Sequence, residues 1–259
     1  MANSQPTLIG ILDFNPMQPP DRLQYAKKIS ELLPQEMQCE KIFFRDATDL
    51  EKYSALILTG SKMSAEDYQT AKDKKEELKG DFIPVDDLVV QLRRYKGPIL
   101  GICFGAQLLA YALGGRIGSV PEFEMGFLDH QLTEDGRKDS VLGHLDDKFY
   151  GFQIHNNIVL ELPKSSKSGP GNSVKESKIL AMRNNFIHAY STEMADGTMR
   201  YGVQPHPEMT TERNIYFFPK LKLMQGDITE EQYKEATKIP ADSNFRFNEV
   251  IKRFAETCR

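Results

Sequence analysis

The sequence has few cysteines, little net charge and no long apolar run, and each absence excludes a class of protein. Its three cysteines are too few and too scattered for a disulfide framework or a cysteine metal cluster, which suits a reducing compartment. Its net charge of −4 predicts no broad basic face for nucleic acid. No stretch approaches the length of a membrane span, and no charged leader precedes an apolar run. We therefore expect a cytoplasmic protein whose partners are neither nucleic acid nor membrane.

The sequence also has no internal repeat and no glycine-rich phosphate loop, and we expect neither a cofactor nor a bound metal. His130, His144 and His188 have no ligand-like spacing, and we interpret them as structural or exposed. What is present is a chain of 259 residues with 40% hydrophobic content, which is long enough to bury a full core.

Strand-like and helix-like segments alternate in the first part of the chain. Residues 7–13, 37–44 and 55–58 are apolar runs typical of buried strands, and residues 23–33 have the apolar spacing of a helix. Strand, helix and strand at this spacing indicate parallel pairing with a crossover helix. We therefore predict an α/β fold with an open, mostly parallel sheet flanked by helices.

Residues 97–115 place a cysteine at a sharp turn. A short apolar run before Cys103 indicates a strand, and the Leu- and Ala-rich segment after Gly105 indicates a helix. Such a nucleophile elbow lifts the sulfur above the sheet edge, and the helix N-terminus favours its thiolate. The N–H of Phe104 is then placed to donate to an oxyanion. A cysteine that ends a buried strand is, however, more often a small core residue.

A second motif, residues 201–208, favours the catalytic interpretation. It ends with His206 and Glu208 on what we predict to be the end of a strand, where residues two apart point the same way. A cysteine nucleophile needs an imidazole to take its proton, and the imidazole needs a partner that fixes its tautomer. Taken alone, this His-Pro-Glu segment fits a polar loop equally well.

Together the two motifs resemble the class I, or triad-type, glutamine amidotransferases. That family has a Gly-x-Cys-x-Gly-x-Gln elbow followed far downstream by Gln-x-His-Pro-Glu, and residues 101–107 and 204–208 match these patterns. The resemblance extends over residues 7–210 and is to a free-standing counterpart of the glutaminase domain of GMP synthase. It implies a flavodoxin-like fold and the catalytic residues Cys103, His206 and Glu208.

The resemblance also implies an oxyanion hole and a substrate contact. The family often has a Gly-Gly pair after the third strand, one of whose N–H groups is the second oxyanion donor. This chain has Gly60-Ser61, and we expect Ser61 to donate while Gly60 allows the turn. The last glutamine of the elbow motif helps to hold the substrate in the family. Here it is Gln107, for which a buried, hydrogen-bonded structural role is the alternative.

Four further residues occupy positions near the expected substrate. Glu124, Gly126 and Phe127 match positions where family members contact the amino-acid end of the substrate. His155 lies where the family has a histidine followed by an acidic residue, but here that acidic position is an asparagine. His155 is the rival general base. We rank it below His206 because it has no carboxylate two residues on, and we expect it to line the site.

Beyond Glu208, the segments 211–225, 230–237 and 244–257 have helical spacing. We therefore divide the chain into a class I glutamine amidotransferase-like domain, residues 1–208, and a helical C-terminal extension, residues 209–259, packed on the same domain.

Three functions follow as hypotheses. The first is a glutaminase that converts L-glutamine into glutamate and ammonia through a cysteine thioester, for a separate synthetase or synthase that accepts the ammonia. The second is a γ-glutamyl peptidase or hydrolase that uses the same triad on a γ-glutamyl compound. The third is a non-catalytic binding module.

Overall fold

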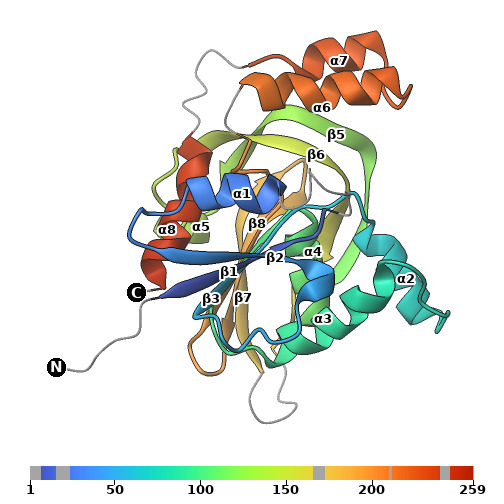
Figure 1. Cartoon of the computed structure of the whole chain (residues 1–259). Helices are drawn as coiled ribbons and strands as arrows, with labels where there is room; N and C mark the ends of the chain where they lie inside the picture. The colour runs from blue at the N-terminus through green and yellow to red at the C-terminus, as the bar shows by residue number, and fades with distance from the viewer. Residues whose placement is uncertain (1–6, 16–23, 166–172, 210–211, 240–245, 259) are drawn as a thin grey trace.

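A nine-stranded mixed sheet forms the middle of the molecule, with helices on both of its faces (Figure 1). The structure is a computed structural model and describes residues 7–15, 24–165, 173–209, 212–239 and 246–258. The strands occur in the order β2-β1-β3-β4-β9-β8-β6-β5-β7. Their bounds are β1 Leu8–Asp13, β2 Gln38–Phe43, β3 Ala55–Leu58, β4 Ile99–Ile102, β5 Arg116–Leu132, β6 Lys148–Glu161, β7 Val174–Arg183, β8 Phe186–Met194 and β9 Met199–Val203.

One half of the sheet is parallel, as the sequence predicts. Strands β2, β1, β3, β4 and β9 pair in parallel register. The crossover helix between the first two strands is α1, Gln24–Glu31. Such pairing brings the carboxyl ends of neighbouring strands to the same edge of the sheet. The segments that follow β3, β4 and β9 therefore begin side by side.

The other half is antiparallel, so the prediction of a mostly parallel sheet is wrong for this part of the chain. Strands β5, β6, β7 and β8 pair antiparallel with one another, and β8 joins β9 antiparallel. Antiparallel neighbours need only a short turn between them. Asn184 and Asn185 form such a turn between β7 and β8, with φ angles of 48° and 65°. Positive φ at both central residues is typical of the type I′ hairpin turn.

Alternate side chains of the buried strands contact the helices on opposite faces of the sheet. In β3, Leu56 and Leu58 face the helices α2 (Ala65–Asp73), α3 (Phe82–Arg94) and α4 (Phe104–Ala112). Ala55 and Ile57 of the same strand face α1 and α8, Glu249–Thr257. Because successive side chains of a strand point to opposite faces, an apolar run buries both faces of the sheet at once. The remaining short elements are η1 Phe44–Asp46, α5 Glu134–Lys138 and η2 Arg246–Asn248.

The helices expected after residue 208 are present. They are α6 (Glu212–Met224), α7 (Glu230–Ala236) and α8, while residues 211 and 244–245 of the predicted segments lie outside the described residues. In Figure 1, α6 and α7 lie together at one end of the molecule, beside β5 and β6. α8 instead packs on the sheet, where Phe254 is completely buried.

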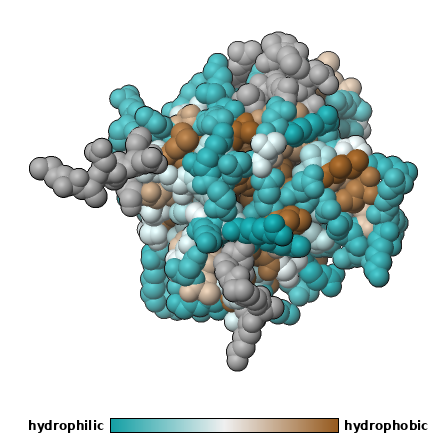
Figure 2. Space-filling view, turned by 60° about the horizontal axis from the view of Figure 1, so that its bottom comes forward, coloured by the Kyte–Doolittle hydropathy of each residue, from teal (hydrophilic) through white to brown (hydrophobic). Residues whose placement is uncertain are grey.

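The molecular surface seen in Figure 2 is mainly hydrophilic, with hydrophobic side chains in separate groups between the polar ones. Exposed large hydrophobic residues come from several different elements, among them Ile83 in α3, Leu160 in β6 and Phe217 in α6. None of the helices in the described ranges has both the length and the apolar character needed to cross a bilayer.

We predict that α8 contributes substantially to stability. Phe254→Ala should lower the free energy of unfolding by about 3 to 5 kcal/mol, because it leaves a cavity under the sheet. Phe217→Ala removes a side chain that is 58% exposed and serves as the control. It should change the free energy of unfolding by no more than about 0.5 kcal/mol. Urea denaturation measures both variants, and equal effects would contradict the packing of α8.

Candidate active site

Cys103 lies at a strained turn between β4 and α4. Its φ of 52° and ψ of −110° are rare for a residue with a side chain. The Cys103 N–H donates to the carbonyl of Val203 at 2.8 Å, and the Gly105 N–H donates to the carbonyl of Thr59 at 3.1 Å. A Cβ on Gly105 would lie 2.4 Å from the Leu58 carbonyl oxygen, so only glycine fits against this strand. The elbow that the sequence predicts is therefore present in the backbone.

Strand β9 brings the second motif to the elbow. It pairs in parallel with β4, with Val203 opposite Ile102, so Gln204 and Cys103 leave the sheet at the same edge. His206 and Glu208 lie on a turn after β9, and not on the strand end that the sequence suggests. The His206 N–H donates to the Phe152 carbonyl at 2.9 Å, which anchors this turn on β6.

The imidazole of His206 lies between a carboxylate and the elbow. Its Nδ1 is 2.7 Å from Oε1 of Glu208, and its Nε2 has no hydrogen-bond partner. A Cβ built on Gly60 would lie 2.7 Å from Cε1 of His206 and 3.6 Å from Cβ of Cys103. The ring and the cysteine therefore meet beside this glycine. Cys103, His206 and Glu208 are each at most 4% exposed.

The electrostatics of this group favour a charged imidazole. Burial alone would lower the pKa of His206, but the nearby Glu208 and Cys103 outweigh burial and raise this pKa to about 10. The imidazolium can thus persist at neutral pH, where it can give a proton to a leaving group.

Two of the expected oxyanion residues, Phe104 and Gly60, lie next to Cys103. Phe104 is the first residue of α4, so its N–H has no partner within the helix. Gly60 follows β3 and lies beside Cys103, as the distances above show. The Ser61 hydroxyl donates to the Phe14 carbonyl and accepts from the Met63 N–H, which holds this turn in place.

The structure shows Gln107 bound by other parts of the protein. Its Nε2 donates to the Asn157 carbonyl at 2.7 Å and to Oε1 of Gln204 at 3.0 Å. The two contacts use both N–H groups of the amide and tie α4 to β6 and to the turn after β9. A contact between Gln107 and substrate stays a prediction.

The other four residues expected near the substrate do not form one group: Glu124 and His155 pair with each other, whereas Gly126 and Phe127 each pack elsewhere. Glu124 and His155 are opposite each other on β5 and β6, with Oε2 and Nε2 3.1 Å apart. Gly126 lies under α7, where a Cβ would be 2.7 Å from Cα of Ala236. Phe127 packs on Phe152 with ring centroids 5.5 Å apart and lines the same narrow recess as His206.

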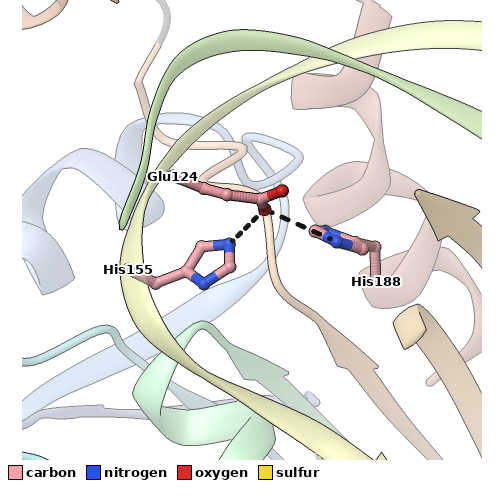
Figure 3. A group of neighbouring side chains, drawn as sticks. All are labelled: Glu124, His155 and His188. Atoms are coloured by element: carbon pink, nitrogen blue, oxygen red, sulfur yellow. Dashed lines mark ion pairs between the residues drawn. The ribbon is translucent and has the colours of Figure 1, made fainter. Parts of the chain in front are cut away.

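His155 has a carboxylate partner after all, but the partner comes from the neighbouring strand. Burial lowers the pKa of His155, whereas Glu124 acts in the opposite direction. Glu124 also lies 3.6 Å from Nε2 of His188 (Figure 3). His130 and His188 are each 1% exposed, and the side chain of His144 is 6% exposed, so none of these three histidines is exposed.

Two residues beside the candidate triad were not expected from the sequence. The Tyr25 ring lies 6.5 Å from that of His206, and burial together with Glu208 and Cys103 raises the Tyr25 pKa. The Asp13 carboxylate accepts the Ala26 N–H at 2.9 Å, and its pKa is raised by burial and by Glu208. These two residues lie on α1 and β1, which carry no motif of the family signature.

Comparison with known proteins decides the family. The profile of the family described as Glutamine amidotransferase class-I matches residues 37–224, which is well over half of the chain. The chain belongs to this family. The match includes the elbow, the His206–Glu208 turn and all strands from β2 to β9.

Relatives of this class I amidotransferase chain bear two kinds of names. Gamma-glutamyl peptidase 4 of Arabidopsis thaliana is 25% identical over 213 residues, covering 78% of this chain and 71% of the relative. One subunit of the glutamine-hydrolysing GMP synthase of Ignicoccus hospitalis is 33% identical over 139 residues, covering 53% and 65% respectively. The crystal structure of a glutamine amidotransferase from Thermotoga maritima has a TM-score of 0.64 at 16% identity, with 98% and 99% of the two chains covered. That structural likeness supports the fold alone.

We predict that Glu208 keeps His206 charged in this amidotransferase chain. In Glu208→Gln, the pKa of His206 should fall by about 1 to 3 pH units because the compensating negative charge is lost. The wild-type ring has a pKa raised to about 10, so it contributes stability that is complete below about pH 6.5 and is lost as the pH rises through about 10. NMR titration of the histidine ring protons measures this midpoint.

The control for this titration is Glu249→Gln. Glu249 lies 3.8 Å from His144, so its replacement should leave the midpoint of His206 unchanged. A wild-type midpoint near that of a free histidine, or no change in Glu208→Gln, would contradict the pairing.

Proposed function

We propose that this chain hydrolyses the side-chain amide of glutamine to glutamate and ammonia through a thioester at Cys103. The observation that carries this proposal is the His206–Glu208 pair, 2.7 Å apart, placed beside a cysteine in a strained elbow. Membership in the class I amidotransferase family supports the same chemistry.

The proposed reaction has two stages. The thiolate of Cys103 attacks the carboxamide carbon, and His206 gives its Nε2 proton to the amine as the C–N bond breaks, so ammonia leaves and a thioester remains. A water molecule then gives a proton to His206 and attacks the thioester. This step breaks the C–S bond, releases glutamate and restores the thiolate. Glu208 keeps the proton of Nδ1 directed toward itself throughout, so Nε2 is the atom that exchanges protons.

Backbone donors stabilise the negative oxygen formed in each stage. We assign this role to the Phe104 N–H and to the N–H of Ser61 in the turn that Gly60 begins. Their support is their position, because Phe104 opens α4 and Gly60 lies beside Cys103. Loss of one such donor typically raises the barrier by about 3 to 4 kcal/mol.

A separate enzyme is the proposed acceptor of the ammonia. The similarity to a protein named as one subunit of a GMP synthase supports this proposal, since that name describes one part of an assembly.

The thiol mechanism also requires a reduced cysteine. Cys39, Cys103 and Cys258 are all free, which suits the cytoplasm.

A γ-glutamyl peptidase is the second candidate. It is supported by the match to gamma-glutamyl peptidase 4, which extends over more of this chain than the match to the GMP synthase subunit. The two reactions share the thioester and differ in the leaving group, which is ammonia in one and the amine of a peptide in the other.

One assay tests both candidates. Glutamate release from glutamine and from γ-glutamyl dipeptides is measured for the purified wild-type chain, for Cys103→Ala and for the control Cys258→Ala. We expect faster release from glutamine, a loss of at least about 1,000-fold in Cys103→Ala, and near-normal rates in Cys258→Ala. The loss is large because Cys103 is the group that forms the proposed covalent intermediate.

The assay also has outcomes that contradict the proposal. Preference for the dipeptides would favour the peptidase. Turnover that survives in Cys103→Ala would remove the assigned nucleophile, and a wild-type chain that hydrolyses neither substrate would favour a non-catalytic binding module.

A further inference from the structure

Three ligand-type side chains that do not belong to the candidate triad converge in the antiparallel half of the sheet. Glu124 of β5, His155 of β6 and His188 of β8 point toward one another (Figure 3). Oε2 of Glu124 is 3.1 Å from Nε2 of His155 and 3.6 Å from Nε2 of His188. One ligand atom from each residue lies within 4.8 Å of the others.

These three atoms are buried, and their ion-pair contacts lack good hydrogen-bond geometry. His155 is 5% exposed and His188 is 1% exposed. Glu124 and His155 form an ion pair at 3.1 Å, but Oε2 of Glu124 and both Nε2 atoms have no hydrogen bond of normal geometry. Buried polar atoms are nearly always paired, and an unpaired one destabilises the fold. Three such atoms in one place need a common explanation.

A metal ion supplies that explanation. The ligand atoms of one metal ion point their lone pairs at the ion and not at each other. They can therefore lie close together without the geometry of a hydrogen bond. For tetrahedral zinc with bonds of about 2.0 to 2.1 Å, neighbouring ligand atoms lie about 3.4 Å apart. The two contacts of Glu124 fall on either side of this value. We propose that Glu124, His155 and His188 bind a divalent transition-metal ion of the zinc type.

Neighbouring side chains hold two of the three ligands, Glu124 and His188, in suitable orientations. Nε of Arg183 donates to Oε1 of Glu124 at 3.3 Å, which leaves Oε2 for the ion. The amide of Gln153 lies 3.2 Å from Nδ1 of His188 and 2.6 Å from Nε2 of His130. When Nε2 of His188 binds metal, Nδ1 carries the proton and needs an acceptor. In the present orientation, the side-chain oxygen of Gln153 has no hydrogen-bond partner. If the side-chain amide is flipped by 180°, this oxygen accepts the proton of Nδ1 of His188.

None of the three proposed ligands is one of the proposed catalytic residues, although His155 lies within electrostatic range of His206. The test of the metal site does not depend on glutaminase activity. The experiment uses the untagged full chain with Cys103→Ala, so that zinc cannot bind the candidate catalytic thiol. The protein is dialysed against EDTA and then titrated with Zn²⁺ by calorimetry. The visible spectrum of the Co²⁺ form reports the coordination geometry.

We expect one ion per chain and the intense visible bands of tetrahedral Co²⁺. Adding His188→Gln to the Cys103→Ala chain should weaken Zn²⁺ binding by at least about 100-fold, since loss of even an outer partner of a metal ligand costs about 10- to 100-fold. The matched control is His144→Gln in the same background. His144 is also largely buried but lies at the Arg246 carbonyl, away from the group, so binding should be unchanged.

Circular dichroism verifies that each variant is folded. The absence of stoichiometric Zn²⁺ binding by the folded Cys103→Ala chain would overturn the proposal, even if His188→Gln fails to fold. Equal binding by His188→Gln and His144→Gln would also overturn it.

Discussion

The backbone conformation of Cys103 is the constraint on which the candidate site depends. A residue with a side chain at positive φ costs about 1 to 3 kcal/mol and persists only where its surroundings enforce it. Here the two strands that flank β4 do so, because Cys103 bonds to Val203 of β9, and Gly105 bonds to Thr59 at the end of β3. The Phe104 N–H, at the start of α4, is left without an intrahelical partner next to Cys103. The strain is therefore offset by hydrogen bonds to the sheet.

Strand order then determines which groups meet the sulfur. Because β3 and β9 are the neighbours of β4, the turn after β3 supplies Gly60 and the turn after β9 supplies His206. The antiparallel half has a supporting role, since the Phe152 carbonyl of β6 fixes the backbone of His206. Gln107 links the same two regions through its bonds to Asn157 and Gln204. Residues far apart along the chain thus converge through strand pairing and through these hydrogen bonds.

Local signals predict much of this arrangement. The elbow and the His-Pro-Glu turn are short motifs, and the apolar runs of β1, β3 and β4 match the sheet core. The antiparallel half was harder to predict because the long strands β5 and β6 mix buried and exposed positions without strict alternation. The partnership of Glu124 with His155 and His188 leaves no local pattern at all. The pairing of Glu124 with His155 can be recognised only once the register of β5 with β6 is known.

The most direct test of the account is to identify the covalent intermediate. The wild-type chain is mixed with glutamine, quenched with acid during turnover, digested and analysed by mass spectrometry. The account predicts a γ-glutamyl group on the peptide that contains Cys103, with the peptides of Cys39 and Cys258 unmodified. Glutamate formation without any label on Cys103, or a label on another residue, would contradict it.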